Sequence, residues 1–198
     1  MAWPPPTTLQ GELVTVAPLR VEHHDALVDV VRDGELWKLW YTKVPSPESM
    51  QADIDRRLGL QQRGSMLPFV IIDRTKNKVV GATSYMNIDA ENRRVEIGST
   101  WYAQSAQRTG LNTACKYLLL RHAFDQLDCV AVEFRTGSIN FQSRAAIERL
   151  GAKLDGILRS HQHYANGALR DTCVYSITAA EWPTVKAHLE WQMTKPRT

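Results

Sequence analysis

The chain has 198 residues, about the length of one domain, and a net charge of +3. Hydrophobic residues make up 43% and charged residues 23%, a balance that excludes an intrinsically disordered chain. A basic stripe with interleaved aromatics, an apolar run of ~18 residues and a signal peptide are all missing from the sequence, so we expect a cytoplasmic protein that contacts neither nucleic acid nor membrane.

The first half of the chain starts with a predicted strand over residues 12–19 and a helix over residues 21–33, where apolar residues recur at helical spacing. A second helix is predicted from Ser46, with this serine as N-cap and Pro47 at the first helical position. Three apolar, β-branched runs follow at residues 67–73, 79–88 and 94–102. The short polar turns between them predict an antiparallel meander.

The second half begins with a long helix that opens near Gly110. A strand over residues 130–135 and a short helix over residues 140–150 follow, and Gly151 stands where a C-terminal cap glycine belongs. Asn166-Gly167 predicts a hairpin turn between two strands, and a last helix is predicted from residue 180 to 191. We therefore predict one α+β domain over residues 1–198, with a mixed sheet and a core at residues 11–178.

The stretch Gln107-Arg108-Thr109-Gly110, between a strand and the long helix, has the features of an anion site. Unpaired N–H groups of a first helical turn point toward such a loop, and the helix dipole adds partial positive charge. A single glycine does not make the dinucleotide fingerprint, and no Gly-Lys-Ser/Thr completes a phosphate-binding loop. Read alone, the stretch is a weak signal, because a single glycine between a loop and a helix more often reflects ordinary turn chemistry.

The order of elements and three motifs resemble the GNAT acyl-CoA N-acetyltransferase family, in particular its branch of ribosomal-protein N-terminal acetyltransferases. Gln107 and Gly110 match the family's loop motif Gln/Arg-x-x-Gly-x-Gly/Ala, from which Asn112 departs at the final small residue. The segment Glu96-Ile97-Gly98 matches an acidic residue and a glycine in the preceding strand, and Asn140 with Ser143 matches the Asn-x-x-Ser that opens the next short helix.

The resemblance implies a transfer of the acetyl group of acetyl-CoA to a primary amine, on a protein N-terminus or a small molecule, by direct attack in a ternary complex. The pyrophosphate would bind mainly to the backbone of the loop and first turn: Gln107, Arg108, Thr109, Gly110, Leu111 and Asn112. The pantetheine arm would run between the strand ending at Tyr102 and the strand over residues 130–135, which splay apart. The arm and the thioester carbonyl would be held by backbone groups of Ser99, Thr100, Trp101 and Tyr102, and the pantetheine amide by Asn140.

Direct transfer requires that the acceptor ammonium lose a proton and the thiolate gain one. Alternation along the strand puts Glu96 on one face with Gly98 and Thr100, where its carboxylate is a candidate base; the alternative is a solvated or salt-bridged residue. Ser143 is the candidate acid, because the family's tyrosine in this helix has no counterpart and Phe141 cannot donate a proton. The alternative for both Ser143 and Asn140 is helix capping.

Trp37, Trp40 and Tyr41 lie at helical spacing between the first two helices, where the resemblance places the acceptor wall; a packing face is the alternative. His161 and His163 have no third ligand nearby, so we expect no metal site. A homodimer through the last helix, which carries Trp182 and Trp191, is compatible with the sequence. The rival to an enzyme is a regulatory acyl-CoA-binding protein that has lost turnover.

Overall fold

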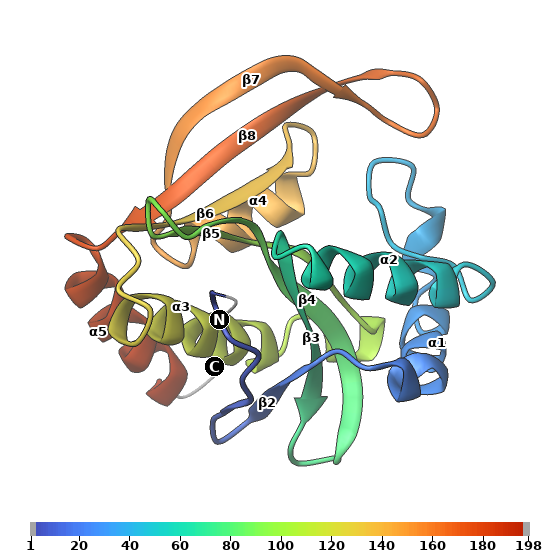
Figure 1. Ribbon diagram of the computed structural model, residues 1–198, viewed down its shortest axis with the longest axis horizontal. Coiled ribbons are helices and arrows are strands. Elements are labelled where there is room, and N and C mark those ends of the chain that lie inside the picture. The colour runs from blue at the N-terminus through green and yellow to red at the C-terminus, as the bar shows by residue number, and fades with distance from the viewer. Residues whose placement is uncertain (1–2, 196–198) are drawn as a thin grey trace.

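The computed structural model describes residues 3–195, which form an eight-stranded sheet with helices on both faces (Figure 1). The strand order is β1-β2-β3-β4-β5-β6-β8-β7, and only β5 and β6 pair in parallel among the described strands. The strands are β1 (Leu9–Gln10), β2 (Val14–Pro18), β3 (Met66–Asp73), β4 (Lys78–Asp89), β5 (Arg94–Tyr102), β6 (Ala131–Gly137), β7 (Lys153–His163) and β8 (Leu169–Thr178). The α-helices are α1 (His24–Arg32), α2 (Met50–Gln62), α3 (Leu111–Asp125), α4 (Phe141–Glu148) and α5 (Trp182–Thr194).

The predicted α+β class with a mixed, mostly antiparallel sheet is therefore confirmed. The meander β3-β4-β5 follows its predicted order, and the hairpin β7-β8 turns through Gly167, whose φ of 83° favours glycine. Gly151 lies in the turn after α4 with a φ of 94°, and its N–H donates to the carbonyl of Glu148, the last residue of the helix, at 2.9 Å. The short edge strand β1 was not predicted.

One prediction about the segment between α1 and α2 is wrong. The helix predicted from Ser46 begins instead at Met50, because Ser46 and Ser49 bond to each other in a turn that precedes it. The segment with Trp37, Trp40 and Tyr41 is a single 3-10 turn followed by a loop. The helical spacing is not used there, because the extended backbone of Leu39 (φ −78°, ψ 110°) ends the turn between Trp37 and Trp40.

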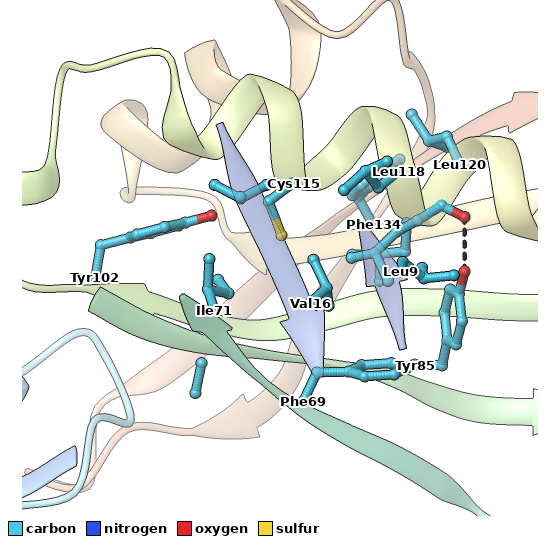
Figure 2. Packing of buried hydrophobic residues seen from close by; sticks show 14 of the residues in the cluster. Leu9, Val16, Phe69, Ile71, Tyr85, Tyr102, Cys115, Leu118, Leu120 and Phe134 are labelled. Atoms are coloured by element: carbon cyan, nitrogen blue, oxygen red, sulfur yellow. Dashed lines mark hydrogen bonds between the residues drawn. The ribbon is translucent and has the colours of Figure 1, made fainter. Parts of the chain in front are cut away.

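The core extends over both faces of the sheet, with α3 packed on one face and α1 and α2 on the other (Figure 1). Phe69 and Tyr85 pack edge to face beneath α3, with ring centroids 5.7 Å apart (Figure 2). The Tyr85 hydroxyl donates to the backbone carbonyl of Leu119 at 2.6 Å, so its burial leaves no polar atom unpaired. These contacts fix the position of α3, and with it the loop that precedes the helix.

At the end of the chain, α5 packs against α3. Trp182 is buried, stacks on Phe124 and donates its indole N–H to Asp125 at 2.6 Å, so it closes the core from this side. Trp191 is exposed. Within the described residues, no helix is both long and apolar enough to cross a membrane.

Candidate active site

A break in the sheet separates the later parts of β5 and β6. The two strands pair at Arg94, Val95 and Glu96, opposite Ala131, Val132 and Glu133, and no further pair follows. Both strands nevertheless continue, β5 to Tyr102 and β6 to Gly137. We call this break the seam. Along it, the edge of β5 from residue 97 to 102 keeps backbone groups unpaired toward β6, and these can bind a ligand.

The first turn of α3 opens beside the C-terminal end of β5. The N–H of Leu111 donates to Thr109 Oγ1 at 3.3 Å. The N–H groups of Gly110, Asn112 and Thr113 have no acceptor within residues 3–195. Three free donors at the positive end of a 15-residue helix form an anion-binding arrangement.

The loop before α3 is held by its own side chains. Gln107 donates to the carbonyl of Tyr102 at 3.3 Å, and Thr109 to the carbonyl of Ala106 at 2.7 Å. The left-handed residue is Arg108, with a φ of 57°, whereas Gly110 has an ordinary φ of −74°. The backbone angles therefore do not require glycine at position 110.

Asn112 lies in this first turn with its side-chain oxygen buried and without a hydrogen-bond partner. A buried carbonyl oxygen without a donor is costly, and a ligand N–H would satisfy it. Asn112, the residue that departs from the loop motif, thus places a buried hydrogen-bond acceptor beside the free N–H groups.

A β-bulge interrupts β5 between Gly98 and Trp101, and Ser99 there has a φ of 51°. The prediction that Thr100 shares a face with Glu96 is wrong, because the extra residue reverses the alternation. A Cβ on Gly98 would point at Glu96 Oε1, whereas Thr100 reaches α3, where it accepts a hydrogen bond from Lys116. The bulge thus aims neighbouring backbone groups of β5 in a direction that a regular strand would not allow.

Glu96 is buried at the point where the seam begins. Asn87 donates to its Oε2 at 2.6 Å, and Arg135 Nε lies 3.6 Å from the same oxygen. Burial raises the pKa of the Glu96 carboxyl, while the hydrogen bond from Asn87 and the charge of Arg135 oppose this rise. A carboxylate whose pKa is raised toward neutrality is better matched to general-base work than a solvated one.

Glu96 also belongs to a charged row, so the salt-bridged alternative describes part of its environment. Arg135 bonds to Glu133 at 2.9 Å, and Glu133 bonds to Arg94 at 2.6 Å. A groove of ≈ 500 Å³ runs along this face of β6 and β8 beside Arg135. The groove is related to Glu96 through Arg135, which lines it and lies 3.6 Å from the Glu96 carboxylate.

Asn140 and Ser143 open α4. The Asn140 side chain accepts the Ser143 N–H at 3.1 Å, so the capping role is observed. The Ser143 hydroxyl has no protein partner in the described part of the chain, and the Asn140 amide nitrogen has none either. Both side chains therefore keep polar groups free for a ligand while the cap is formed.

We expect Asn140→Ala to lower the free energy of unfolding by about 1 kcal/mol, because the Ser143 N–H loses its acceptor. Urea unfolding followed by circular dichroism measures this. Asn140→Asp is the matched control, since a carboxylate caps as well as an amide oxygen. Equal stability of the alanine variant and the wild type would contradict the capping role.

Of the aromatic segment, Trp37 packs against the core and Trp40 is 49% exposed. Trp40 meets Tyr164 of the β7–β8 turn edge to face, with centroids 5.0 Å apart. The Tyr164 hydroxyl lies directly over Gly137, where β6 ends. Trp40 and Tyr164 thus form an aromatic bridge over the far end of the seam, and Tyr41 packs against its outer side at 5.8 Å.

Sequence reasoning missed three residues of this region: Arg57, Lys116 and Tyr164. Arg57 and Lys116 are buried although their types are usually exposed, and no local pattern signals this. Tyr164 is placed by the hairpin, which the Asn-Gly signal located without showing what it would touch. No group of three His, Cys, Asp or Glu side chains suited to a metal ion occurs among residues 3–195.

Comparison with known proteins agrees with this geometry. A family model described as "Acetyltransferase (GNAT) domain" matches residues 14–153. The chain belongs to the GNAT acetyltransferase family. The matched range runs from β2 to the start of β7, so it includes the seam, the bulge, the loop before α3 and the opening of α4.

Individual relatives come from several bacteria. "Putative ribosomal N-acetyltransferase YdaF" of Bacillus subtilis (strain 168) is 35% identical over 102 residues, which are 52% of this chain and 55% of that protein, so this match spans about half of each. A GCN5-related N-acetyltransferase structure from Brucella melitensis has a TM-score of 0.85 at 27% identity and covers 96% of this chain and 87% of its own. Mycobacterium smegmatis RimJ, solved in complex with CoA-disulfide, has a TM-score of 0.79 at 25% identity and covers 96% of both chains.

Proposed function

We propose that the protein is an acetyl-CoA-dependent N-acetyltransferase that moves an acetyl group to a primary amine. The observation that carries the proposal is the coincidence of three features along one seam. Unpaired backbone lies beside β5, free N–H groups open α3, and a buried carboxylate stands where the two strands part. The complex of the RimJ neighbour with CoA-disulfide supports CoA as the ligand of this cleft.

The pyrophosphate of acetyl-CoA would be held by the N–H groups of Gly110, Asn112 and Thr113, with Arg108 adding charge. Gln107 and Thr109 would hold the loop in shape through their bonds to backbone carbonyls. The pantetheine arm would bond to the free edge of β5, including Ser99, Thr100, Trp101 and Tyr102, and Asn140 would bind one of its amides. Bound acetyl-CoA supplies the activated acetyl group.

In this proposal, residues of the chain take the two protons that the acceptor nitrogen loses, give one proton to the sulfur and stabilise one developing negative charge. Glu96 Oε1, which is free of the Asn87 bond, draws a proton from the acceptor ammonium, directly or through water. Backbone N–H groups of the bulge stabilise negative charge on the carbonyl oxygen as the amine attacks. The Ser143 hydroxyl gives a proton to the departing sulfur and regains the second proton that the nitrogen loses as the amide forms, while Glu96 later releases its proton to solvent.

The acceptor would enter through the groove on the Glu96 face and pass under the aromatic bridge of Trp40 and Tyr164. Trp37 and Tyr41 would support the bridge. An ammonium is attracted to aromatic faces, so this wall suits a protonated amine. An amine of a protein, such as its N-terminus, agrees with the name of the ribosomal N-acetyltransferase relative, and a small amine is the other acceptor class.

The test is CoA release from acetyl-CoA against a panel of peptides with free N-termini, amino acids, polyamines and amino sugars. We expect turnover with at least one primary amine and intersecting-line kinetics, as a ternary complex requires. A ping-pong pattern with a trapped acyl-enzyme would refute direct attack. Tight binding of acetyl-CoA without acetylation of any panel member would support the non-catalytic alternative.

A further inference from the structure

The β5 bulge is held from one face by a buried arginine of α2. Arg57 donates to Ser99 Oγ at 2.8 Å and to Ser84 Oγ at 3.2 Å, while its Nε bonds to Asp53 at 2.6 Å. Its side chain is 3% exposed. The guanidinium thus connects α2 to the residue whose positive φ creates the bulge.

From the opposite face, a buried lysine of α3 holds the next residue of the bulge. Lys116 Nζ donates to Thr100 Oγ1 at 2.6 Å and to Thr83 Oγ1 at 3.2 Å. The residue is 5% exposed, and no Asp or Glu oxygen of residues 3–195 lies within ion-pair distance of it. An ammonium buried against two hydroxyls, with no carboxylate, is costly, and an apolar side chain of similar length would be cheaper for folding.

We propose that Lys116 and Arg57 are positioning residues for acyl transfer, each holding one hydroxyl of the β5 bulge so that the backbone between Ser99 and Tyr102 keeps the orientation that binds the acyl thioester. This inference rests on the proposed acetyl-CoA site. The inference explains why the Lys116 ammonium is buried although its burial is unfavourable for folding. It also makes α3 contribute twice, through its first turn and through the lysine one turn further on.

Lys116 makes this positioning sensitive to pH. Burial lowers the pKa of the Lys116 ammonium to about 8. The neighbouring Cys115 does not titrate in the same range, because burial raises the pKa of its thiol. Below pH 8 the ammonium donates to Thr100 with full charge, and above it the neutral amine donates more weakly. The positioning is therefore present at lower pH and is lost as pH rises through the pKa.

Lys116→Met, Lys116→Arg and wild type test this inference, with kcat, KM and the dissociation constant of acetyl-CoA measured across the pH interval that brackets about 8. We expect wild-type kcat to fall about tenfold across it, the equivalent of one charge-assisted hydrogen bond. In the Lys116→Met variant, kcat has the low value at every pH and shows no step. The arginine variant keeps the high value throughout, because its charge does not titrate. Lys153→Met, at an exposed lysine paired with Glu181, should keep the wild-type profile.

Thr83 and Thr100 lie 2.8 Å apart through their hydroxyls, so the methionine variant leaves them paired and is expected to fold. A wild-type pH step that persists in Lys116→Met would overturn the inference, whatever the arginine variant does. Failure of the wild type to bind acetyl-CoA at any pH would instead overturn the proposed function. Arg57→Lys, which keeps the charge, should retain more kcat than Arg57→Met at equal acetyl-CoA KM, and equal losses in both variants would also count against the inference.

Discussion

Glu96→Gln is expected to lower kcat by about 100-fold or more, the range typical of a lost general base, while acetyl-CoA affinity stays unchanged. The glutamine keeps the size of the side chain and can still accept the bond from Asn87, but it cannot take a proton. Because burial raises the pKa of the Glu96 carboxyl, wild-type kcat/KM should rise with pH through a value above the usual one for glutamate. The variant should lack this rising limb. Stopped assays over a pH series, with calorimetry for acetyl-CoA binding, measure both quantities.

Glu133→Gln is the matched control for the loss of one negative charge. Glu133 stands opposite Glu96 on β6 and lines the groove, where it pairs with Arg94 and Arg135. Its substitution should change the KM of the acceptor and keep kcat and the rising pH limb, with the limb shifted to lower pH because the charge of Glu133 helps to raise the pKa of the Glu96 carboxyl. If Glu96→Gln changed only the acceptor KM as well, Glu96 would be a binding residue and the base would have to be sought elsewhere.

Gly110→Pro is expected to weaken acetyl-CoA binding by about tenfold or more, because one N–H to a charged phosphate oxygen is worth about 1.5–3 kcal/mol. The φ of −74° at this N-cap fits proline, so the fold should survive. The substitution removes the free N–H and adds a ring where the ligand would approach. Calorimetric titration with CoA gives the affinity, and circular dichroism checks that the variant is folded.

Gly110→Ala separates the loss of the N–H from the crowding caused by the added side chain. Alanine keeps the N–H and tolerates the same backbone angles, so any loss of affinity in this variant reports crowding alone. A folded proline variant that binds CoA as tightly as the wild type would show that the first turn of α3 does not hold the pyrophosphate.

The parts of the fold that could be predicted are those with a local cause. The meander could be predicted because short polar turns separate β-branched runs. The cap of α4 could be predicted because Asn140 has a residue type and a spacing typical of an N-cap. The N-cap of α2 was misassigned because Ser46 and Ser49 both fit the pattern, and their mutual hydrogen bonds decide between them.

The parts that could not be predicted depend on contacts distant in sequence. The bulge at Ser99 carries no glycine, so its positive φ has no signal, and one inserted residue moved Thr100 to the other face. Lys116 and Arg57 look like surface residues of two helices until the sheet that covers them is known. The residues that shape the candidate site thus follow from tertiary packing, while the loop and helix that open it follow from local sequence.

The seam also divides the sheet mechanically. The strands β1 to β5 form one block and β6, β8 and β7 another, and backbone pairing joins the two at three positions. The helix α3 carries the chain from one block to the other and packs against both, on Tyr85 of β4 and near Phe134 of β6 (Figure 2). Cohesion of the two half-sheets therefore depends on the same 15 residues whose first turn faces the cleft. A substitution on the sheet-facing side of α3 would loosen the scaffold and the cleft together.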